Sequence, residues 1–577
     1  MQLSVNKKKL ISYISLFSIV LILINNMFYS FNWTDEGFYL STVNRFYQGD
    51  TFFADDWSPT QTYMILLYPF YSLYMQVNGS TEGVYLFFRI ITCLFQGLTA
   101  FFTFFILSKK WPLRAAVFAS FLPVIFSRAC INGPSYYVVG FETYLLGLLF
   151  LFTFFEIKNS VIFPIGAGLF FALAVLCNPY LALPYIAVSA LVLIHPASRK
   201  HWKSCLAIWL TTFIVAVAYI LTVFKIDRID DVVKSIHYIF NDPDYGKTLI
   251  LTIKRLYKMP RLILFPYLLS YSPVLIAGII LKKKSAFKDS AKKVLFLLNT
   301  LLFIVSIFFS LDCGSATMPF FHYSLLTALI FNDFNIKSFL SANKKDLLYF
   351  VLPGMILAYF FCFASDTGFG VCAIGITLAD IGMISVYFKA AKKLDLKFSL
   401  IKKIICYIPA VILISVTFFY RLNITYMDAL LSPRLIFIPQ LNANIEKISA
   451  GPAKGLYTAK VFKEQYDSVL STISQIKAKD GESILISSIC PWAHLILPEL
   501  KTSSPTTFRV PFSDYRIRPY FEEFPKHKFP DYVLLLDKSI YRNDRKNDIE
   551  NTWLKSKLEE KGYRSTTVSC GVLYQAR

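Results

Sequence analysis

The sequence is poor in charged residues. Asp, Glu, Lys and Arg make up 17% of its 577 residues, whereas soluble globular proteins usually carry about 25%. Hydrophobic residues account for 55%, and the mean hydropathy is +0.51. The runs at 10–30, 136–155, 204–224 and 402–420 are each close to the roughly 20 apolar residues that cross a bilayer. This composition excludes a soluble globular protein and predicts an α-helical polytopic membrane protein.

The sequence also lacks the motifs of metal and nucleotide sites. None of its ten cysteines stands in a CxxC or Cys/His metal-ligand spacing, and most lie inside apolar runs. Only Cys490 and Cys570 fall in the C-terminal region, where a disulfide and two unpaired thiols are both open. Neither a GxGxxG nor a P-loop motif is present, so no nucleotide-binding loop is indicated. No internal repeat or low-complexity tract interrupts the chain.

Acidic residues are outnumbered by basic ones, 37 to 59, which gives a net charge of +22. A basic balance of this size can indicate nucleic-acid binding. Here, however, the basic residues cluster in alternate connectors between apolar runs, as topology signals do. These connectors hold Lys7 to Lys9, then Lys109, Lys110 and Arg114, then Lys158, then Arg199, Lys200 and Lys203, then 282–293, then Lys337, Lys344 and Lys345, and finally 389–403. The pattern predicts no nucleic-acid partner and a multi-pass protein of the cytoplasmic membrane.

The same alternation predicts about 13 spans, with the N-terminus in the cytoplasm. The first run is longer than a signal-peptide core and lacks a small-residue cleavage site, so we interpret it as an uncleaved span. The intervening connectors are mostly acidic or neutral and are predicted to lie outside, although 225–259 carries both signs. The runs 62–77 and 113–128 are short enough to leave the count uncertain by one or two.

The C-terminal region differs in character, and we predict two domains, 1–435 in the membrane and 436–577 outside it. Helical spacing is present in "AKVFKEQYDSVLSTISQIKAKD" and "DIENTWLKSKLEEKGY", and buried strands are indicated by "ESILISSI" and "DYVLLLDKS". These patterns predict a small α/β domain. Its loop-rich segment "PWAHLILPELKTSSPTTFRVPF" is predicted to pack back onto the membrane domain.

Two acidic pairs stand out in the predicted first external loop, 31–84. Asp35 and Glu36 follow the first span, and Asp55 and Asp56 come about 20 residues later. Carboxylates beside the hydrocarbon boundary are partly desolvated and usually have a partner or a function. The stretch "EGFYLSTVNRFYQ" has the spacing of a short amphipathic helix that lies along the membrane, with the first pair at its start. The alternative is a helix cap at Asp35 and a solvated acidic loop.

The arrangement resembles the first external loop of the C-type glycosyltransferase superfamily, which includes protein O-mannosyltransferases and bacterial aminoarabinose transferases. The resemblance rests on the acidic pair after the first span, the interfacial helix, "YQGD" and "FADDW". The segments "NGPSYYVVGFETYLLGLLFLF" and "FALAVLCNPYLALPY" extend it weakly. "DWSPTQTYM" departs from the Lys-Pro-Pro-like segment of many relatives, which leaves the acceptor and the subfamily open.

The resemblance implies a sugar donor linked to polyprenyl phosphate and an acceptor that is an envelope glycan, a lipid or a protein. Carried onto this chain, Asp35 is the candidate general base, and Glu36 supports it or helps to position a ligand. Asp55 or Asp56 would lie opposite and bind the acceptor or a metal. The resemblance makes no cofactor certain; a divalent metal ion is one option, held, if present, by Asp35, Asp55 and Asp56. The displacement at the anomeric carbon would proceed with inversion.

A departing lipid phosphate carries negative charge and calls for cationic or hydrogen-bonding groups. The predicted substrate-binding residues are Arg45, Arg89, Arg128, His322 and Tyr323, with Arg228, Lys254, Arg255 and Arg261 as further external cations. Snorkelling to headgroups of membrane lipids is the alternative explanation for Arg89 and Arg128. Asp312 and Asp366 begin short external turns, where an Asp is ordinary turn chemistry.

A transporter or flippase, or a polymerase, of lipid-linked envelope glycans is the rival function. Transporters place ionisable residues near the bilayer midplane, often within repeated halves. In this chain the acidic residues fall in predicted external loops, the spans hold few charges and no repeat is visible. The sequence therefore favours a glycosyltransferase.

Overall fold

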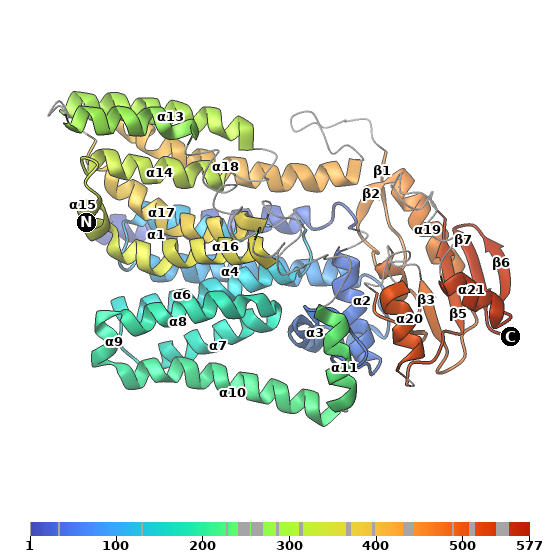
Figure 1. The fold of residues 1–577 in the computed structure, drawn as a ribbon. Helices are drawn as coiled ribbons and strands as arrows, with labels where there is room; N and C mark the ends of the chain where they lie inside the picture. The colour runs from blue at the N-terminus through green and yellow to red at the C-terminus, as the bar shows by residue number, and fades with distance from the viewer. Residues whose placement is uncertain are drawn as a thin grey trace.

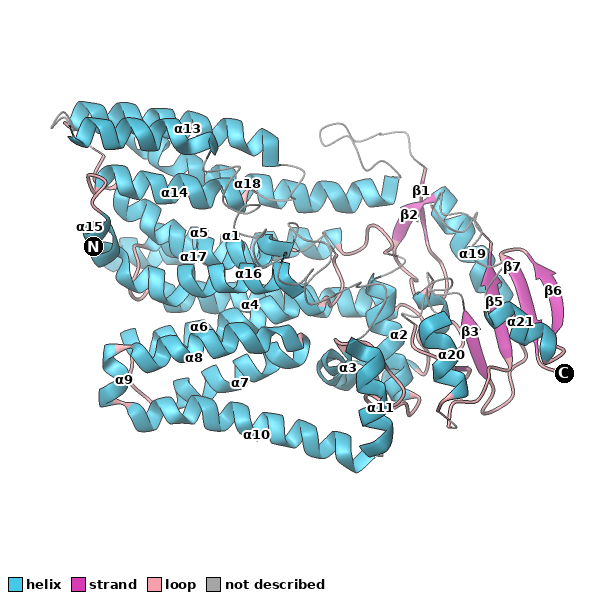
Figure 2. Cartoon of the chain, in the orientation of Figure 1, coloured by secondary structure: helices cyan, strands magenta, loops and turns pink. Residues whose placement is uncertain are grey.

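The computed structural model has a bundle of long helices and, at one end of it, a smaller domain that contains a sheet (Figures 1 and 2). The residues described are 2–32, 35–127, 131–226, 229–240, 254, 269–283, 288–310, 316–364, 371–394, 399–430, 444–486, 490–506, 514–524, 526–537 and 553–577. The predicted boundary between residues 435 and 436 lies outside them. The fold class predicted from the sequence, a polytopic helical protein with a small C-terminal α/β region, is confirmed.

Apolar helices form the bundle. Within the described ranges, seven are long and apolar enough to cross a membrane, and five shorter apolar helices accompany them. The predicted number of about 13 spans stays a prediction. The helices of the bundle are α1 (Gln2–Asn26), α4 (Val84–Leu107), α5 (Leu113–Ile125), α6 (Tyr136–Glu156), α7 (Ile162–Cys177), α8 (Ala182–Ile194), α10 (Trp202–Ile226), α13 (Asp289–Ser310), α14 (Thr317–Phe331), α15 (Ile336–Asp346), α16 (Leu352–Ala364), α17 (Cys372–Ala391) and α18 (Ser399–Leu430).

Large apolar side chains cover the outside of this bundle. On α10, Leu206, Leu210, Phe213 and Ile214 are between 48% and 64% exposed. A continuous apolar surface of this kind is unfavourable in water and suits the hydrocarbon of a bilayer, in which a helix satisfies its own backbone groups. The chain is therefore a multi-pass membrane protein.

At the centre of the bundle, α16 and α17 pack closely through small residues. A Cβ atom on Gly354 would lie 2.4 Å from the backbone nitrogen of Ala379, and one on Gly375 would lie 2.1 Å from that of Ala358. Glycine at these two positions lets the helix backbones approach, as is common between membrane helices. Helix α17 is buried along almost its whole length, so the bundle has a compact core around it.

The two ends of the bundle differ. The basic connectors with α9 (Pro196–Lys200) and α15 lie at one end, and the C-terminal domain lies at the other (Figure 1). Beside that domain lie the two helices of the predicted first loop, α2 (Asp35–Tyr47) and α3 (Met64–Asn78), and the amphipathic α11 (Ile229–Phe240). The helix expected over "EGFYLSTVNRFYQ" corresponds to α2, so the first acidic pair opens α2 and the second pair follows it.

The C-terminal domain contains a five-stranded mixed sheet with strand order β4-β3-β5-β7-β6. Strand β3 runs parallel to β4 and β5, whereas β7 is antiparallel to β5 and β6. A separate antiparallel pair, β1–β2, lies near the bundle. The elements are β1 (Ile445–Lys447), β2 (Tyr457–Ala459), α19 (Lys460–Ser474), β3 (Ser483–Ile486), η8 (Pro491–Leu495), β4 (Lys501–Thr502), α20 (Asp514–Glu522), β5 (Tyr532–Leu536), α21 (Trp553–Glu560), β6 (Arg564–Val568) and β7 (Gly571–Gln575).

Four elements of this domain match the sequence patterns: α19, β3, β5 and α21. Strand β5 is buried at every position, which explains its continuous apolar run. The β6–β7 hairpin was not predicted, because β6 is almost wholly exposed and carries no apolar alternation. Cys490 and Cys570 are both buried free thiols, so the structure has the second of the two alternatives left open for them.

The segment beginning "PWAHLIL" packs back onto the rest of the protein, as predicted. Trp492 and Leu495 share one apolar cluster with Leu40 of α2, Tyr71 of α3 and Tyr85 of α4. The C-terminal domain therefore rests directly on the first loop.

Candidate active site

Asp35 is the first residue of α2, and its side chain is exposed. The backbone N–H of Glu36 donates to the side-chain oxygen of Asn32 at 3.2 Å, which satisfies one of the free donors of the first helical turn. A carboxylate in this turn is also stabilised by the positive end of the helix dipole. Asp35 is thus a carboxylate held at a fixed place on the surface beside the membrane bundle.

Glu36, its neighbour, points into the protein and forms a closed ion pair with Arg89 of α4. Nε and Nη2 of Arg89 donate to the two carboxylate oxygens of Glu36, both at 2.6 Å. The third nitrogen, Nη1, donates to the carbonyl oxygens of Met27, Tyr29 and Ser30 at 2.9–3.1 Å. Both side chains are fully buried, and such a bidentate pair has a fixed geometry. The pair therefore ties the start of α2 to the end of the first span.

A segment from another part of the chain closes over this pair. A Cβ atom on Gly133 would lie 2.4 Å from Oε1 of Glu36, so only glycine fits there. The next two residues are held by tyrosines of the first loop: Tyr63 donates to the carbonyl of Pro134 at 2.9 Å, and the hydroxyls of Tyr39 and Ser135 are 3.4 Å apart. The "NGPSYY" segment that carried part of the resemblance thus packs against the start of α2.

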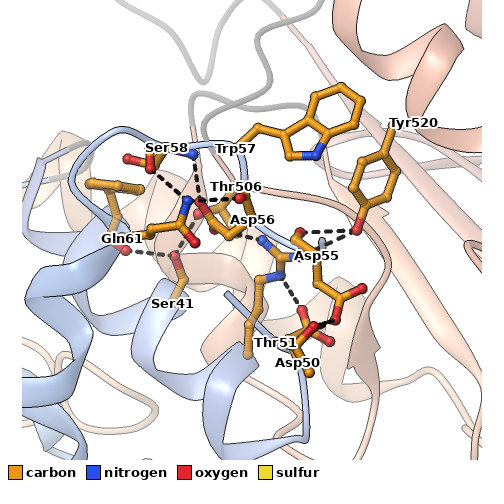
Figure 3. Close-up of polar contacts among 12 residues, drawn as sticks. Ser41, Asp50, Thr51, Asp55, Asp56, Trp57, Ser58, Gln61, Thr506 and Tyr520 are labelled. Carbon is orange, nitrogen blue, oxygen red and sulfur yellow. Dashed lines mark hydrogen bonds and ion pairs between the residues drawn. The ribbon is translucent and has the colours of Figure 1, made fainter. Parts of the chain in front are cut away.

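The second acidic pair lies at the other end of α2 and surrounds Arg45. Arg45 Nη1 donates to Asp56 Oδ2 at 2.9 Å, and its Nη2 donates to the backbone oxygen of Asp55 at 2.6 Å. Its Nε lies 2.7 Å from a carboxylate oxygen of Asp50. Figure 3 shows Asp50, Asp55 and Asp56 gathered at one point, with Tyr520 of the C-terminal domain beside them. Arg45 and Asp56 are fully buried.

Asp55 is held by the C-terminal domain. Its Oδ1 lies 3.0 Å from Nε2 of His527 and 2.9 Å from Nζ of Lys526, and its Oδ2 accepts from Thr51. Burial alone would raise the pKa of Asp55, but the hydrogen bonds of His527 and Thr51 and the charge of Lys526 together lower this pKa below its ordinary value. Asp55 is therefore a charged carboxylate bound to two basic side chains of the same protein.

A buried histidine completes this end of α2. Burial and, secondarily, the positive charge of Arg45 lower the pKa of His494 to about 3. His494 is therefore neutral at physiological pH and does not add a second positive charge beside Arg45. The acids around Arg45 interact with Arg45 itself and with Lys526, and Asp56 also feels the positive charge of Arg516.

The two acidic pairs do not meet. Ten residues separate Asp35 from Arg45, which binds the second pair, and a helix rises about 1.5 Å per residue, or about 15 Å over this length. Among the described residues no three His, Cys, Asp or Glu side chains form a group that could hold a metal ion. The metal set of Asp35, Asp55 and Asp56 therefore does not fit this structure. The placement of Asp55 or Asp56 opposite Asp35 stays a prediction, although the two pairs lie at opposite ends of α2.

The remaining predicted residues lie elsewhere or outside the described part of the chain. His322 and Tyr323 are buried in α14, where His322 Nδ1 lies 2.9 Å from the Met318 carbonyl oxygen and the Tyr323 hydroxyl 3.2 Å from that of Thr300. Lys254 is described and exposed. Residues of the sequence analysis that fall outside the description are Arg128, Arg228, Arg255, Arg261, Asp312 and Asp366.

Sequence reasoning missed a polar cluster inside the bundle. Arg421 of α18 donates through Nη1 to the carbonyl of Val124 at 2.8 Å and through Nη2 to Gln96 Oε1 at 3.2 Å. Gln96 in turn donates to the carbonyls of Pro123 and Phe126. These contacts satisfy the last carbonyls of α5, a helix of only 13 residues. A single charge within an apolar run was the available signal.

No protein-family model matches the sequence, and neither does any sequence among the curated proteins. Among solved structures, the chain is similar to ArnT from Cupriavidus metallidurans in the apo state, with 10% identity, a TM-score of 0.45 and 97% of each chain covered. For ArnT from the same organism bound to undecaprenyl phosphate, the identity is 11%, the TM-score is 0.45 and 97% of each chain is covered. For the oligosaccharyltransferase of Archaeoglobus fulgidus in complex with Zn and sulfate, the identity is 12% and the TM-score is 0.48. The match covers 96% of this chain and 73% of that chain.

These matches are a likeness of fold alone. The functional argument below rests on the residues of this chain.

Proposed function

We propose that the protein is a membrane glycosyltransferase that moves a sugar from a polyprenyl-phosphate donor to an acceptor outside the cytoplasmic membrane. The observation that carries the proposal is the contrast within the first acidic pair. Glu36 is closed off by Arg89, whereas Asp35 next to it is exposed at the membrane end of the first loop. A fixed and accessible carboxylate is what a general base needs.

In the proposed reaction Asp35 accepts the proton of an acceptor hydroxyl. The acceptor oxygen forms a bond to the anomeric carbon of the sugar, and the bond from that carbon to the phosphate oxygen breaks. The polyprenyl phosphate departs with the electron pair, and attack from the opposite face inverts the anomeric configuration. Glu36 and Arg89 take no part in proton transfer in this proposal; they hold the backbone that carries Asp35.

The leaving phosphate needs a cationic partner. The contacts of Arg89 and Arg45 show that neither side chain is well placed to serve as this partner. All three guanidinium nitrogens of Arg89 donate hydrogen bonds within the protein, to Glu36 and to three backbone carbonyls. Arg45 is likewise surrounded by Asp50, Asp56 and the Asp55 carbonyl. Both are therefore poorly suited to bind a lipid phosphate. Arg128 lies outside the described residues, so its role in binding the phosphate stays a prediction from the sequence.

The proposed orientation places the N-terminus in the cytoplasm and the C-terminal domain outside. It is supported by the basic connectors, which gather at the end of the bundle opposite the C-terminal domain (Figure 1). In this orientation Asp35 faces the compartment in which nucleotide sugars are scarce and lipid-linked donors are the available form. The acceptor is then an envelope glycan, a lipid or a protein.

The test is transfer of a radiolabelled hexose or pentose from undecaprenyl phosphate by the purified protein in proteoliposomes. Asp35→Asn keeps the shape of the side chain and removes the base, and it should lower transfer by about 10²- to 10⁴-fold. Asp480→Asn is the matched control, since Asp480 is an exposed acid of the C-terminal domain, and it should leave transfer unchanged. Transfer by Asp35→Asn at the rate of the unsubstituted protein would contradict the proposal. Flux of an intact lipid-linked glycan that depends on Asp35 would favour the transporter instead.

A further inference from the structure

Trp492 of the C-terminal domain touches the chain on both sides of Asp35. The ring of Phe31, before Asp35, meets the indole edge-on with centroids 5.4 Å apart. Gly37, after Asp35, lies so close that a Cβ atom there would be 3.0 Å from the backbone nitrogen of Trp492 and 3.1 Å from its Cβ. The indole is fully buried. One side chain from the other end of the sequence therefore supports the short segment that carries the proposed base.

Trp492 is itself held in place by its own domain. Tyr466 of α19 stacks on the indole at 4.5 Å between centroids and 18° between planes. The Tyr466 hydroxyl donates to the carbonyl of Ala450 at 2.9 Å. Because both rings are buried and paired, the indole has little freedom to turn away. Any movement of the C-terminal domain relative to α2 would therefore move the indole of Trp492 as well.

The backbone ahead of Asp35 is also joined to this domain. The N–H of Ser30 donates to the carbonyl of Tyr457 at 2.9 Å, and the N–H of Tyr457 donates to that of Phe28 at 2.7 Å. The side chains of Tyr29 and Tyr457 stack at 5.5 Å. These contacts extend β2 onto the chain that leaves the first span, so the C-terminal domain fixes where this chain turns into α2.

The same domain follows one face of α2 along its length. Gly37 lies against Trp492, the hydroxyl of Ser41 is 2.9 Å from that of Thr506, and Gln48, in the turn after α2, donates to Pro498 and Leu500. Arg45, between the last two, reaches Tyr520. Positions 37, 41, 45 and 48 are spaced by four, four and three residues, which places them on one side of a helix. The C-terminal domain therefore contacts the helix that begins with Asp35, and the residue after it, over about three turns.

We propose that Trp492 is a positioning residue for Asp35, and that the C-terminal domain serves to align this base with the acceptor hydroxyl. The inference rests on the proposed function of Asp35. Proton transfer requires the carboxylate within hydrogen-bond reach of the hydroxyl, and a displacement of about 1 Å can cost 10²-fold in rate. Trp492 does not touch the reacting atoms; it acts through Phe31 and Gly37, whose places set the start of α2.

The first experiment compares Trp492→Leu and Trp492→Phe with Leu558→Ala. Leu558 is a fully buried residue of α21 in a separate apolar cluster, so its truncation weakens the domain without touching the start of α2. Trp492→Leu should lower kcat for transfer from undecaprenyl-phosphate sugar by about 10- to 100-fold, with KM for the donor changed less than threefold. Trp492→Phe keeps an aromatic ring and should recover most of kcat. Leu558→Ala should retain the kcat of the unsubstituted protein per folded molecule.

The second measurement needs no substrate. Amide hydrogen exchange of residues 35–40 should be faster in Trp492→Leu and unchanged in Leu558→Ala, because exchange reports local opening. Gly37→Ala makes the reciprocal change from the α2 side and should also speed exchange and lower kcat. The atom nearest to the new Cβ is the Tyr85 hydroxyl at 2.8 Å. Tyr85→Phe should therefore restore part of the kcat lost by Gly37→Ala.

The outcomes separate this inference from the proposed function. If Asp35→Asn abolishes transfer while Trp492→Leu keeps the normal kcat, Trp492 does not position the base, and the proposed function stands. If Trp492→Leu and Leu558→Ala lose kcat and protection together, the domain contributes only general stability, and the inference is overturned. If Asp35→Asn transfers sugar normally, the proposed function fails whatever the Trp492 variants do.

Discussion

The two acidic pairs of the first loop look alike in the sequence and lie at the two ends of the same helix, but their surroundings differ. At the start of α2, Glu36 is neutralised by Arg89 and its neighbour Asp35 stays exposed. At the far end, Asp56 is buried against Arg45, and Asp55 is bound to Lys526 and His527. The first pair has one exposed carboxylate, whereas Asp56 of the second pair is fully buried and Asp55 is largely covered by the C-terminal domain.

This difference shows how a charged pair in a loop is assigned a role. A buried carboxylate that stays charged needs a cation or hydrogen bonds, because desolvation of a lone charge costs several kcal/mol. Asp56 and Glu36 meet this requirement with one arginine each, and both arginines come from positions that the sequence suggested for substrate binding. In the structure, Arg45 and Arg89, both predicted to bind substrate, instead form ion pairs with the acids Asp56 and Glu36.

The sharpest way to break the comparison is to neutralise one acid at each end. Asp35→Asn should lower transfer by about 10²- to 10⁴-fold and lower the free energy of unfolding by no more than about 1 kcal/mol, the size of a helix-dipole interaction. Asp56→Asn should do the opposite: it weakens charge-assisted hydrogen bonds, at a cost of about 1.5–3 kcal/mol in stability, with kcat per folded molecule retained. Transfer assays and denaturant unfolding in detergent micelles measure the two effects. A loss of kcat in folded Asp56→Asn would place the second pair in the chemistry.

Removal of a cation at the first end should cost more stability than any change at the second. Arg89→Met leaves Glu36 buried without a counter-charge and should destabilise the protein by about 3–5 kcal/mol. The double variant Glu36→Gln with Arg89→Met removes both charges and should recover part of this loss. The free energies of unfolding of Arg89→Met and of the double variant, measured by reversible denaturation, test this expectation. Equal stability of Arg89→Met and the unsubstituted protein would show that the pair is not closed in solution.

Acidification should affect the second end selectively. The folded pKa of Asp55 lies below its ordinary value near 4, so its stabilising contribution is fully present above that value and is lost as the pH falls through the folded pKa. The groups facing it are Lys526, His527 and Thr51. The difference in unfolding free energy between Asp55→Asn and the unsubstituted protein should shrink as the pH falls from 4 to 2. A constant difference down to pH 2 would contradict the assignment.

The smallest expected effect concerns the contact of Gln48, in the turn after α2, with the C-terminal domain. Gln48 donates to two backbone carbonyls and accepts from the N–H of Thr502. Gln48→Ala should therefore cost about 1–2 kcal/mol in stability. Gln76, an exposed amide on α3 that bonds only to Ser72 among the described contacts, is the control, and Gln76→Ala should stay within about 0.5 kcal/mol. Equal effects of the two changes would argue against a grip along the whole of α2.

Local patterns predicted much of the architecture. The long apolar runs gave the spans because a bilayer demands about 20 such residues whatever their neighbours are. The helical period gave α2, α19 and α21, and the continuous apolar runs gave β3 and β5. The β6–β7 hairpin was missed because its exposed residues carry no such pattern. The polar cluster of Arg421 and Gln96 was missed because the carbonyls it satisfies come from a helix distant in the sequence.

Within the candidate site, the sequence by itself determined that carboxylates stand at the membrane end of the first loop, since topology and helix period depend on residues near one another. Which carboxylate is exposed and which is held in a buried ion pair was decided only by the tertiary structure. The partners come from α4 for Glu36, from α20 and the residues after it for Asp55, and from η8 for the segment around Asp35. An ion pair or a packed indole requires specific atoms within about 3 to 5 Å, and only the fold brings such distant segments that close.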